Sequence, residues 1–276
     1  MTDHYAVMGN PIAHSKSPNI HTAFAEQTAQ DIDYIAMLVE HGDFVNAVKT
    51  FQQNGGKGLN ITVPFKNEAF ALADSSSTRA ERAGAVNTLI LNDDGSIHGD
   101  NTDGIGIVRD LTQNHAIDLK GQRLLVLGAG GAVQGVLQPL LETLPAEIVI
   151  ANRTASKAVA LAKHFNDAGN ISGCGFDELT GKHFDGIING TAASLQGELP
   201  PLPDDVLSAG GWVYDMMYSA EPTPFMVWAK EHGAGKILDG LGMLVEQAAE
   251  SFDLWRGVHP DSKPVITKLR EGLATN

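Results

Sequence analysis

The stretch Arg123-Leu124-Leu125-Val126-Leu127-Gly128-Ala129-Gly130-Gly131-Ala132 decides the fold. Its first five residues are typical of an apolar strand, its glycines of a tight turn, and Val133–Leu144 of a following helix. Gly128 permits the turn, and Gly130 lets the backbone approach a pyrophosphate. The start of the helix offers amide donors and a partial positive charge to the same anion. This order of elements predicts a Rossmann-like unit that binds a dinucleotide through the glycine stretch.

The fingerprint has one departure, because its third glycine position holds Val133. A single glycine-rich turn is weak evidence, since such turns also form for purely steric reasons. The next strand, Glu147–Ala151, adds a second signal at its end. An NAD-type site usually carries Asp or Glu there, to bind the ribose 2′-hydroxyl. This chain instead has Asn152, Arg153, Thr154 and Lys157.

Arg153 favours a 2′-phosphate over a bare hydroxyl. The planar guanidinium can stack on adenine and grip a phosphate with two hydrogen bonds. The alternative is that Arg153 and Lys157 belong to a solvated first helical turn. Cations at a helix N-terminus oppose the helix dipole, so their presence there favours a functional role over a purely structural one. We therefore expect NADP as the cofactor, bound by Asn152, Arg153, Thr154 and Lys157.

Strand-like and helix-like segments alternate along nearly the whole chain, which is typical of a parallel α/β fold. In the first half, apolar strands are expected at Tyr5–Met8, Tyr34–Leu38 and Gly58–Val63, and a helix from Ser17. The Asn92–Gly95 turn signal predicts one hairpin, so this sheet should be mixed but mainly parallel.

Bulk composition excludes several classes of function. The net charge of 19 − 33 = −14 argues against nucleic-acid binding. No apolar run approaches the ~20 residues that span a bilayer, and the N-terminal residues lack a signal-peptide pattern. The single cysteine, Cys174, excludes an internal disulfide and a cysteine metal cluster. The ten histidines show no helical ligand spacing, so we expect no metal site. The near absence of cysteine is typical of a protein of the reducing cytoplasm, which we expect as its location.

A second set of polar residues lies at strand ends and loops of the first half. Pro64 should end the strand that leads to Lys66, which places that amine beyond a strand end, where α/β proteins collect their chemistry. Taken singly, each residue has a plain structural explanation: Lys66 as a surface lysine, Ser17 or Asp103 as a helix cap, Asn87 as a turn residue. In the predicted sheet, however, they can converge on one cleft.

Together these segments resemble the shikimate dehydrogenase family. They occur in the family's order and cover nearly the whole chain. The matching segments are Ser15-Lys16-Ser17-Pro18, Asn60–Lys66, Gly84–Thr88, Asn101–Gly104, Gly128–Ala132, Asn152–Thr154 with Lys157, Tyr214–Tyr218 and Gly240–Gln247.

The resemblance implies reversible, NADP(H)-dependent reduction of 3-dehydroshikimate to shikimate, on the route to chorismate and the aromatic amino acids. It implies two α/β domains: a substrate domain at residues 1–104 and a Rossmann-like NADP domain at 105–240, with the helices of 241–276 packing back on the first. We expect a monomer or homodimer.

By match, the resemblance also assigns residues to roles. Lys66 and Asp103 look like the catalytic pair, although Lys66 could transfer a proton or only lend its charge. The substrate carboxylate would be bound by Ser15, Ser17 and Tyr218, and the ring hydroxyls by Thr62, Asn87, Asp103 and Gln247. Met216 and Gly240 look like further cofactor contacts, whereas Tyr214 and Asp215 could be strand-end structure alone.

Three alternatives stay open. A related dehydrogenase could act on quinate as well as shikimate, with NAD as a further option; Arg153 argues against NAD, but no residue excludes quinate. Folate methylene dehydrogenases share a two-domain layout and a lysine in the first half, yet fit the serine pair and the Asp103 segment less well. A non-catalytic dinucleotide sensor would not need both Lys66 and Asp103.

Overall fold

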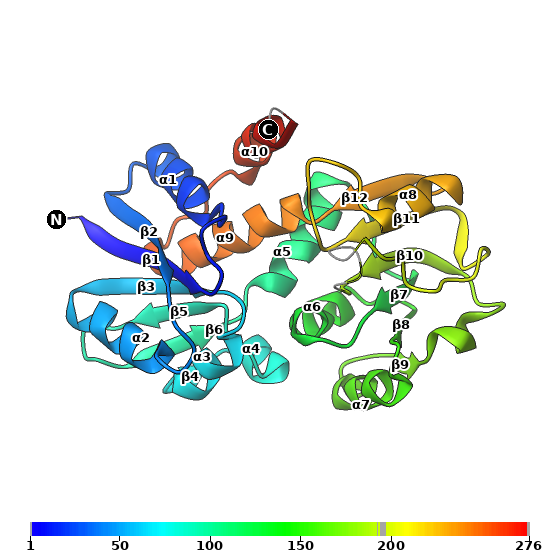
Figure 1. Ribbon diagram of the computed structural model, residues 1–276, viewed down its shortest axis with the longest axis horizontal. Helices are drawn as coiled ribbons and strands as arrows, with labels where there is room; N and C mark the ends of the chain where they lie inside the picture. Colours follow the sequence, from blue (N-terminus) through cyan, green and yellow to red (C-terminus); the bar gives the residue numbers. More distant parts are fainter. Residues whose placement is uncertain (1, 192, 194–196, 275–276) are drawn as a thin grey trace. The chain divides into compact units, whose positions relative to one another are not determined.

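The computed structural model describes residues 2–191, 193 and 197–274. Two compact units can be distinguished: unit 1 consists of residues 1–106 and 244–267, and unit 2 of 107–243 and 268–276. Each unit contains one six-stranded sheet (Figure 1). The expected domain limits at 104/105 and 240/241 lie close to these, but residues from Lys268 onward group with unit 2 rather than with the first domain. Among the described helices, none is long and apolar enough to cross a membrane.

The unit 1 sheet has the strand order β2-β1-β3-β5-β6-β4. Its strands are β1 (Asp3–Gly9), β2 (Ile32–Leu38), β3 (Gly56–Ile61), β4 (Ser75–Ser76), β5 (Thr88–Leu91) and β6 (Ile97–Asp100). β1 pairs in parallel with β2 and β3, and β4 with β6, whereas β5 runs antiparallel to β3 and β6. The expected hairpin and mixed sheet are therefore present.

Both faces of this sheet are covered by helices, and alternate side chains of β1 pack on opposite faces. Ala6 and Met8 join a core with Phe44, whereas Tyr5 and Val7 pack with Tyr34 on the other face. The helices of unit 1 are α1 (Ser17–Thr28), α2 (Phe44–Gln53), α3 (Lys66–Leu72), α4 (Thr78–Ala83), most of α9 (Leu241–Arg256) and the first turns of α10 (Ser262–Ala274). The α5 helix (Asp103–Arg109) and the π turn η1 (Asp110–Asn114) lead into unit 2.

The unit 2 sheet is entirely parallel, with the order β12-β11-β10-β7-β8-β9. Numbered within the unit, this is the 3-2-1-4-5-6 order of a Rossmann fold. Its strands are β7 (Arg123–Leu127), β8 (Glu147–Ala151), β9 (Ile171–Cys174), β10 (Phe184–Asn189), β11 (Leu207–Asp215) and β12 (Lys236–Asp239). The two-domain α/β expectation and the Rossmann-like unit are confirmed.

Strand β7 is buried on both faces, as expected for a strand in the middle of a parallel sheet. Leu124 and Val126 pack against α6 (Gly131–Glu142) and α7 (Ala155–Phe165), and Leu125 and Leu127 share a core with α8 (Pro224–Glu231). A short 3₁₀ helix, η2 (Phe176–Leu179), follows β9. The continuous apolar run that predicted β7 therefore reflects helices on both sides of the sheet.

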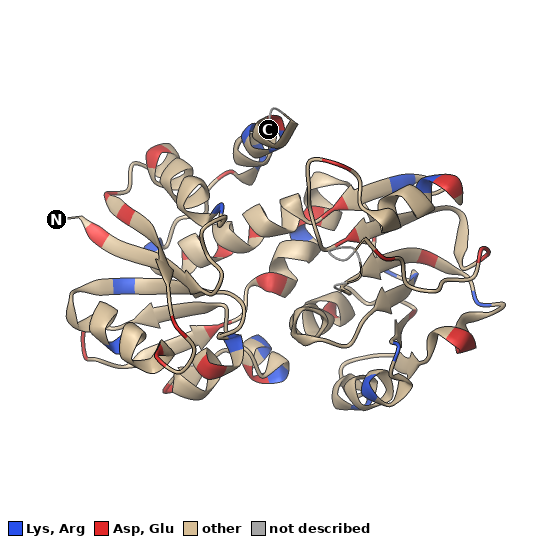
Figure 2. Cartoon of the chain, viewed as in Figure 1, with Lys and Arg blue, Asp and Glu red and all other residues tan. Residues whose placement is uncertain are grey.

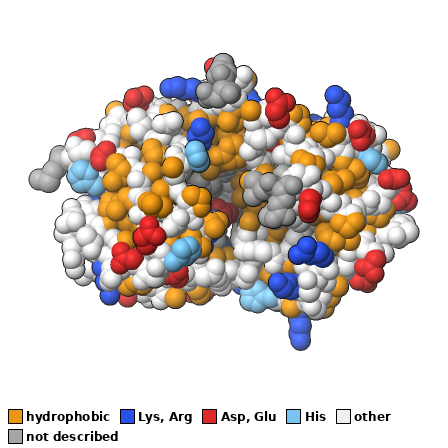
Figure 3. Space-filling view, in the orientation of Figure 1, with side chains coloured by type: hydrophobic (Ala, Val, Ile, Leu, Met, Phe, Trp, Pro, Cys, Tyr) orange, Lys and Arg blue, Asp and Glu red, His pale blue; other side chains and the backbone are white. Residues whose placement is uncertain are grey.

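Acidic residues outnumber basic ones by 33 to 19, and Figure 2 shows them distributed over the elements of both units. On the face drawn in Figure 3, hydrophobic side chains are interspersed with polar ones. The exposed large hydrophobic residues include Leu38 on β2 and Val63 after β3. An anionic ligand therefore depends on local cations and amide donors rather than on the average field of the protein.

Candidate active site

Lys66 is positioned by the turn between β3 and α3. The backbone amide of Phe65 donates to the Thr62 carbonyl at 3.0 Å, which closes the turn. The Phe65 ring is fully buried and stacks on Phe44, with ring centroids 5.0 Å apart. The turn is thus anchored in the core, and Lys66 follows as the first residue of α3. Sequence reasoning anticipated the turn but not the helix.

Lys66 forms an ion pair with Asp103, the first residue of α5. The Lys66 Nζ and Asp103 Oδ2 atoms are 2.5 Å apart, and the two side chains are 27% and 12% exposed. A carboxylate is favoured at the start of a helix, whereas an ammonium group opposes the dipole there. The ion pair with Asp103 therefore offsets the unfavourable position of the Lys66 ammonium group at the start of α3. Asp103 also begins α5 itself rather than capping a helix from Ile105.

Asn87 connects this pair to two further segments. Its Oδ1 accepts from the Thr102 backbone amide at 2.9 Å, and its Nδ2 donates to Asp103 Oδ1 at 2.8 Å. Nδ2 also lies 3.3 Å from Oε1 of Gln247, which α9 contributes to unit 1. Four predicted site residues, Lys66, Asn87, Asp103 and Gln247, thus form one contiguous group.

Ser15 lies just before α1 and Ser17 is the first residue of that helix, and the Ser17 amide donates to Ser15 Oγ at 3.3 Å. The N-cap residue of α1 is Lys16, and it makes no side-chain capping bond. The capping explanation for Ser17 is therefore wrong, and its hydroxyl is not used to begin the helix. The methyl group of Thr62 packs so closely on Gly9 that a Cβ atom at position 9 would collide with that methyl group.

Tyr218 belongs to unit 2, so its predicted contact with the substrate stays a prediction. Burial raises the pKa of its phenol, and nearby Asp239 raises it further. The hydroxyl therefore stays protonated at neutral pH and can donate a hydrogen bond. Tyr214, by contrast, is fully buried in β11 and donates to Asp110 at 2.7 Å, which fits a structural role.

The glycine stretch after β7 fits a pyrophosphate. Gly128 has φ +103°, and a Cβ there would lie 3.2 Å from the Gly190 carbonyl oxygen. Gly130 and Gly131 at the start of α6 face open space, so their backbone is accessible. The first turn of α6 carries no acidic residue and no side-chain cap, which leaves its amides available to an anion.

The departure at Val133 is explained by Gly190. A Cβ at Gly190 would collide with Val133 Cγ2, and Val133 is fully buried. The missing glycine in the fingerprint is therefore replaced by a glycine at the end of the neighbouring strand β10. This compensation involves residues far apart in the sequence and could not be found from the motif alone.

The residues after β8 fit a phosphate on the adenosine ribose. Asn152 Nδ2 donates to the Thr154 carbonyl at 3.0 Å, which shapes the turn. Arg153, Thr154 and Lys157 are exposed, and the first turn of α7 has no acidic residue. These donors suit a dianion such as a 2′-phosphate. They include no carboxylate, which is the group that would bind a bare 2′-hydroxyl.

The other two predicted cofactor residues lie against each other in unit 2. A Cβ at Gly240 would collide with the Met216 carbonyl, and the Gly240 amide donates to Met217 O at 3.0 Å. Gly240 is therefore required for this close approach of two loops. Contact of either residue with the cofactor stays a prediction.

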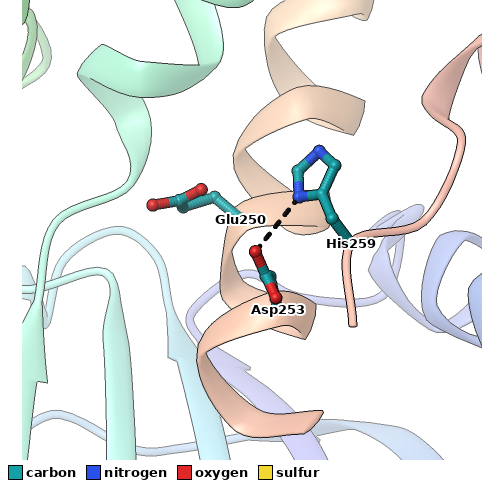
Figure 4. A group of neighbouring side chains, drawn as sticks. All are labelled: Glu250, Asp253 and His259. Atoms are coloured by element: carbon teal, nitrogen blue, oxygen red, sulfur yellow. Dashed lines mark ion pairs between the residues drawn. The ribbon is translucent and has the colours of Figure 1, made fainter. Parts of the chain in front are cut away.

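One group of potential metal ligands was not anticipated. Glu250, Asp253 and His259 offer ligand atoms within 4.8 Å of one another, and Figure 4 shows Glu250 pointing away from the His259–Asp253 pair. The Glu250 carboxylate accepts from Arg79 at 2.9 Å, and His259 Nδ1 lies 3.4 Å from Asp253 Oδ2. These groups are satisfied without an ion, and the expected absence of a metal stays a prediction.

Thr102 is a site residue that sequence reasoning passed over. Its amide and hydroxyl both contact the Asn87 carboxamide, and it is fully buried. Its position in the sequence, directly before Asp103, is the signal that could have identified it. Its role depends on pairing between β5 and β6, which brings residues 87 and 102 together.

Comparison with known proteins places these features in one family. Three family models match the chain: the shikimate dehydrogenase substrate binding domain at residues 7–89, shikimate / quinate 5-dehydrogenase at 110–196, and the shikimate 5′-dehydrogenase C-terminal domain at 240–270. A shikimate dehydrogenase (NADP(+)) of Cellvibrio japonicus is 61% identical over 275 residues, which cover 99% of each chain.

Two solved structures illustrate the similarity of fold. An Ael1 enzyme from Pseudomonas putida is 47% identical with a TM-score of 0.91, covering 97% of this chain and 98% of that one. A shikimate 5-dehydrogenase from Thermus thermophilus, solved in complex with NADP(H) and shikimate, is 32% identical with a TM-score of 0.87. That match covers 99% of this chain and 100% of the other.

Proposed function

The chain belongs to the shikimate dehydrogenase family and is an NADP-dependent oxidoreductase acting on a CH–OH group, and we propose that Lys66 and Asp103 perform the proton step of its reaction. The reaction is the reversible reduction of 3-dehydroshikimate to shikimate, which we place in chorismate and aromatic amino acid biosynthesis. Unit 1 is proposed as the substrate domain and unit 2 as the NADP domain.

The observation that carries the proposal is the 2.5 Å contact between Lys66 Nζ and Asp103 Oδ2, with Asn87 bound to the second carboxylate oxygen. Asp103 is held on both oxygens and can fix the direction of the lysine amine. A structural lysine would not need a carboxylate anchored in this way. The same feature argues against a dinucleotide sensor, which requires no proton donor.

NADPH, when bound, supplies the hydride that reduces the C3 carbonyl. Lys66 then delivers a proton to the oxygen that becomes the alkoxide, and accepts it in the reverse direction. Asp103 accepts hydrogen bonds from Lys66 and from a ring hydroxyl, and so fixes their relative orientation. Thr62, Asn87 and Gln247 bind ring hydroxyls, and Ser15, Ser17 and Tyr218 bind the carboxylate. Neutral donors at the carboxylate leave the proton chemistry to a single ion pair.

The cofactor is proposed to lie along the start of α6 and the end of β8. The pyrophosphate is assigned to the amides of Gly128–Ala132, and the 2′-phosphate to Asn152, Arg153, Thr154 and Lys157. Met216 and Gly240 would line the nicotinamide end. The net charge of −14 and the lone cysteine support a cytoplasmic protein that does not bind nucleic acid, and we propose a monomer or homodimer.

Two substitutions at one position test the proton step. Lys66→Ala should lower kcat by about 10²- to 10⁴-fold, the usual range for a lost general acid, with a much smaller change in KM. Lys66→Arg keeps a positive charge but cannot release its proton at neutral pH. We expect Lys66→Arg to be nearly as impaired as Lys66→Ala in NADPH oxidation with 3-dehydroshikimate.

Recovery of most activity in Lys66→Arg would show that the charge alone matters. Near-normal turnover of Lys66→Ala would remove Lys66 from the mechanism. The wild-type protein is assayed in parallel with quinate and with NAD, which tests the substrate and cofactor assignments. Tight NADP binding without turnover of any of these substrates would favour the sensor.

A further inference from the structure

A buried polar cluster lies directly behind Asn87, on the side away from Asp103. It consists of Asn60 on β3, Thr88 on β5 and Ser251 on α9, of which Thr88 and Ser251 are fully buried. Ser251 lies one helical turn after Gln247, so both side chains project from the same face of α9. None of the three was expected to take part in the reaction, and polar side chains this deeply buried require a reason.

The hydrogen bonds of this cluster have a definite direction. Thr88 Oγ1 lies 2.8 Å from Asn87 Oδ1, which can only accept, so the Thr88 proton points to Asn87. Ser251 Oγ lies 2.8 Å from Thr88 Oγ1, and that contact needs a proton between the two oxygens. With the Thr88 proton directed to Asn87, the single Ser251 proton is shared between Thr88 Oγ1 and the Gln247 carbonyl oxygen, to which Ser251 donates at 3.0 Å. Asn60 Nδ2 donates to both hydroxyls, at 3.0 Å to Ser251 and 3.3 Å to Thr88.

This arrangement determines which way the Asn87 carboxamide faces. Three donors lie within reach of its oxygen: the Thr88 hydroxyl at 2.8 Å, the Thr102 amide at 2.9 Å and the Thr102 hydroxyl at 3.2 Å. With the oxygen fixed, the amide nitrogen points to Asp103 Oδ1. Asp103 then presents Oδ2 to Lys66. The hydroxyl of Thr88 is therefore joined to the Lys66–Asp103 pair through a single side chain.

The Asn60 side chain is itself fixed from the opposite direction. Its Oδ1 accepts from the Tyr34 hydroxyl at 2.7 Å, and the Tyr34 ring stacks on His21 with centroids 4.2 Å apart. With Oδ1 accepting from Tyr34, the Asn60 amide nitrogen faces Ser251 and Thr88. In this arrangement the hydrogen bonds of the cluster lead to the Asn87 oxygen.

We propose that Thr88 is a positioning residue for the reaction, whose hydroxyl, oriented by Ser251 and Asn60, holds the Asn87 carboxamide in the rotamer that aligns Asp103 with Lys66. The inference rests on the proposed roles of Lys66 and Asp103. Thr88 touches neither substrate nor cofactor in this role, and it acts through Asn87 alone. A hydroxyl needed only for packing could be replaced by any group of the same shape.

A matched pair of substitutions separates positioning from packing. Thr88→Val keeps the shape of the side chain and removes its hydroxyl, whereas Thr88→Ser keeps the hydroxyl and removes a methyl group. For Thr88→Val we expect kcat to fall by about 10- to 100-fold, the size of effects seen when a supporting hydrogen bond around a reactive group is lost. KM for shikimate should change by much less. Thr88→Ser should keep kcat within about twofold of the wild type, well under the tenfold that 1.36 kcal/mol represents.

Ser251→Ala provides a second, independent variant. It should lower kcat in the same sense but less, because Asn60 still donates to Thr88. The loss in the double variant Thr88→Val with Ser251→Ala should be smaller than the product of the two single losses, since Ser251 reaches Asn87 through Thr88 at 2.8 Å, with only a longer contact to Thr102 at 3.3 Å beside it. Thermal unfolding of each variant is followed so that kcat is measured on folded protein.

Equal kcat for Thr88→Val and Thr88→Ser, whether normal or reduced, would overturn the proposal. Multiplicative effects in the double variant would also contradict it, because they would indicate separate routes. Wild-type turnover and the Lys66→Ala variant are measured in the same series. If the wild type turns over and Lys66→Ala does not, a normal Thr88→Val refutes only the positioning role; if Lys66→Ala is active, the proposed function fails and the inference with it.

Discussion

At the scale of single residues, Arg153 makes the cofactor assignment testable. Its guanidinium is exposed at the end of β8, beside Thr154 and Lys157, with no acidic residue in the first turn of α7. Arg153→Ala should weaken NADP binding by about 10- to 100-fold, because a phosphate loses a charge-assisted bidentate partner worth roughly 1.5–3 kcal/mol. Binding of NAD, which lacks the 2′-phosphate, should change far less. Titration calorimetry with both nucleotides measures the ratio.

Lys120 offers a control for this measurement, because it is an exposed cation of unit 2 that lies before β7. Lys120→Ala makes the same change in net charge without touching the β8 end. Its NADP affinity should stay within about twofold of the wild type, since exposed charges at a distance are screened by salt. If Arg153→Ala reduced NAD and NADP affinity equally, the 2′-phosphate assignment would be wrong.

At the scale of elements, the packing of helix α6 against the end of strand β10 depends on a glycine outside the fingerprint. Gly190→Ala places a methyl group into Val133 Cγ2 and within 3.0 Å of Met216 Sδ. Overpacking of a buried site typically costs about 1–3 kcal/mol, so the free energy of unfolding should fall by that amount. Thermal or urea unfolding of the variant measures the loss.

The second substitution Val133→Ala should relieve the same collision. It removes the methyl groups that Gly190→Ala strikes, so the double variant should be more stable than the sum of the two single changes predicts. Strict additivity would show that the α6–β10 contact does not explain the valine in the fingerprint. The matched control is Gly130→Ala, which faces open space and should change stability much less.

The same elements show how far sequence can lead. The spans Arg123–Leu127 and Glu147–Ala151 were predicted with their observed ends, because buried parallel strands are continuous apolar runs bounded by turn signals. The short elements β4, β9, β12, α4 and α8 were not predicted, because so few residues give no clear hydrophobic period. Compensation of Val133 by Gly190 needs the strand order, which no local pattern contains.

The candidate site divides in the same way. Lys66, Asp103, Asn87 and Gln247 were named from motifs, and the structure brings them together. The buried hydroxyls of Thr88 and Ser251 were not named, because an isolated Thr or Ser has no chemical signature. Their meaning comes only from hydrogen bonds that join residues 163 positions apart.

At the scale of the whole molecule, the two units should differ in their response to acid. In unit 1, burial lowers the pKa of His21 to about 3, although Asn60 lies close enough to oppose the shift. Burial raises the pKa of Asp100, but Arg79 and Ser77 outweigh it, so that pKa lies below its usual value. Among the described residues of unit 2, the groups with resolved shifts include Cys174, Tyr214, Tyr218 and Arg270, which titrate above neutral pH.

The sign of the His21 contribution follows from linkage. In the unfolded chain the imidazole takes up a proton near pH 6.5, whereas in the folded unit it stays neutral down to about pH 3. Its stabilising contribution is therefore complete above pH 6.5 and is lost progressively as the pH falls toward 3. At pH 4 the loss is on the order of 3 kcal/mol, a large part of a typical domain stability. Asp100 adds a loss below about pH 4, when the unfolded chain takes up a proton that the folded unit still resists.

We therefore predict that unit 1 unfolds at a higher pH than unit 2 during acid titration. The three tryptophans report this, because Trp255 lies in unit 1 with its ring 5.3 Å from His21, and Trp212 and Trp228 lie in unit 2. With 5-fluorotryptophan incorporated, the ¹⁹F signal of Trp255 should reach its unfolded position before the other two. His21→Phe keeps an aromatic ring in the stack but removes the titrating group, so it should move the Trp255 transition toward those of Trp212 and Trp228. Coincident transitions in the wild type, or a Trp255 transition that His21→Phe leaves in place, would mean that the buried imidazole does not control the acid stability of unit 1.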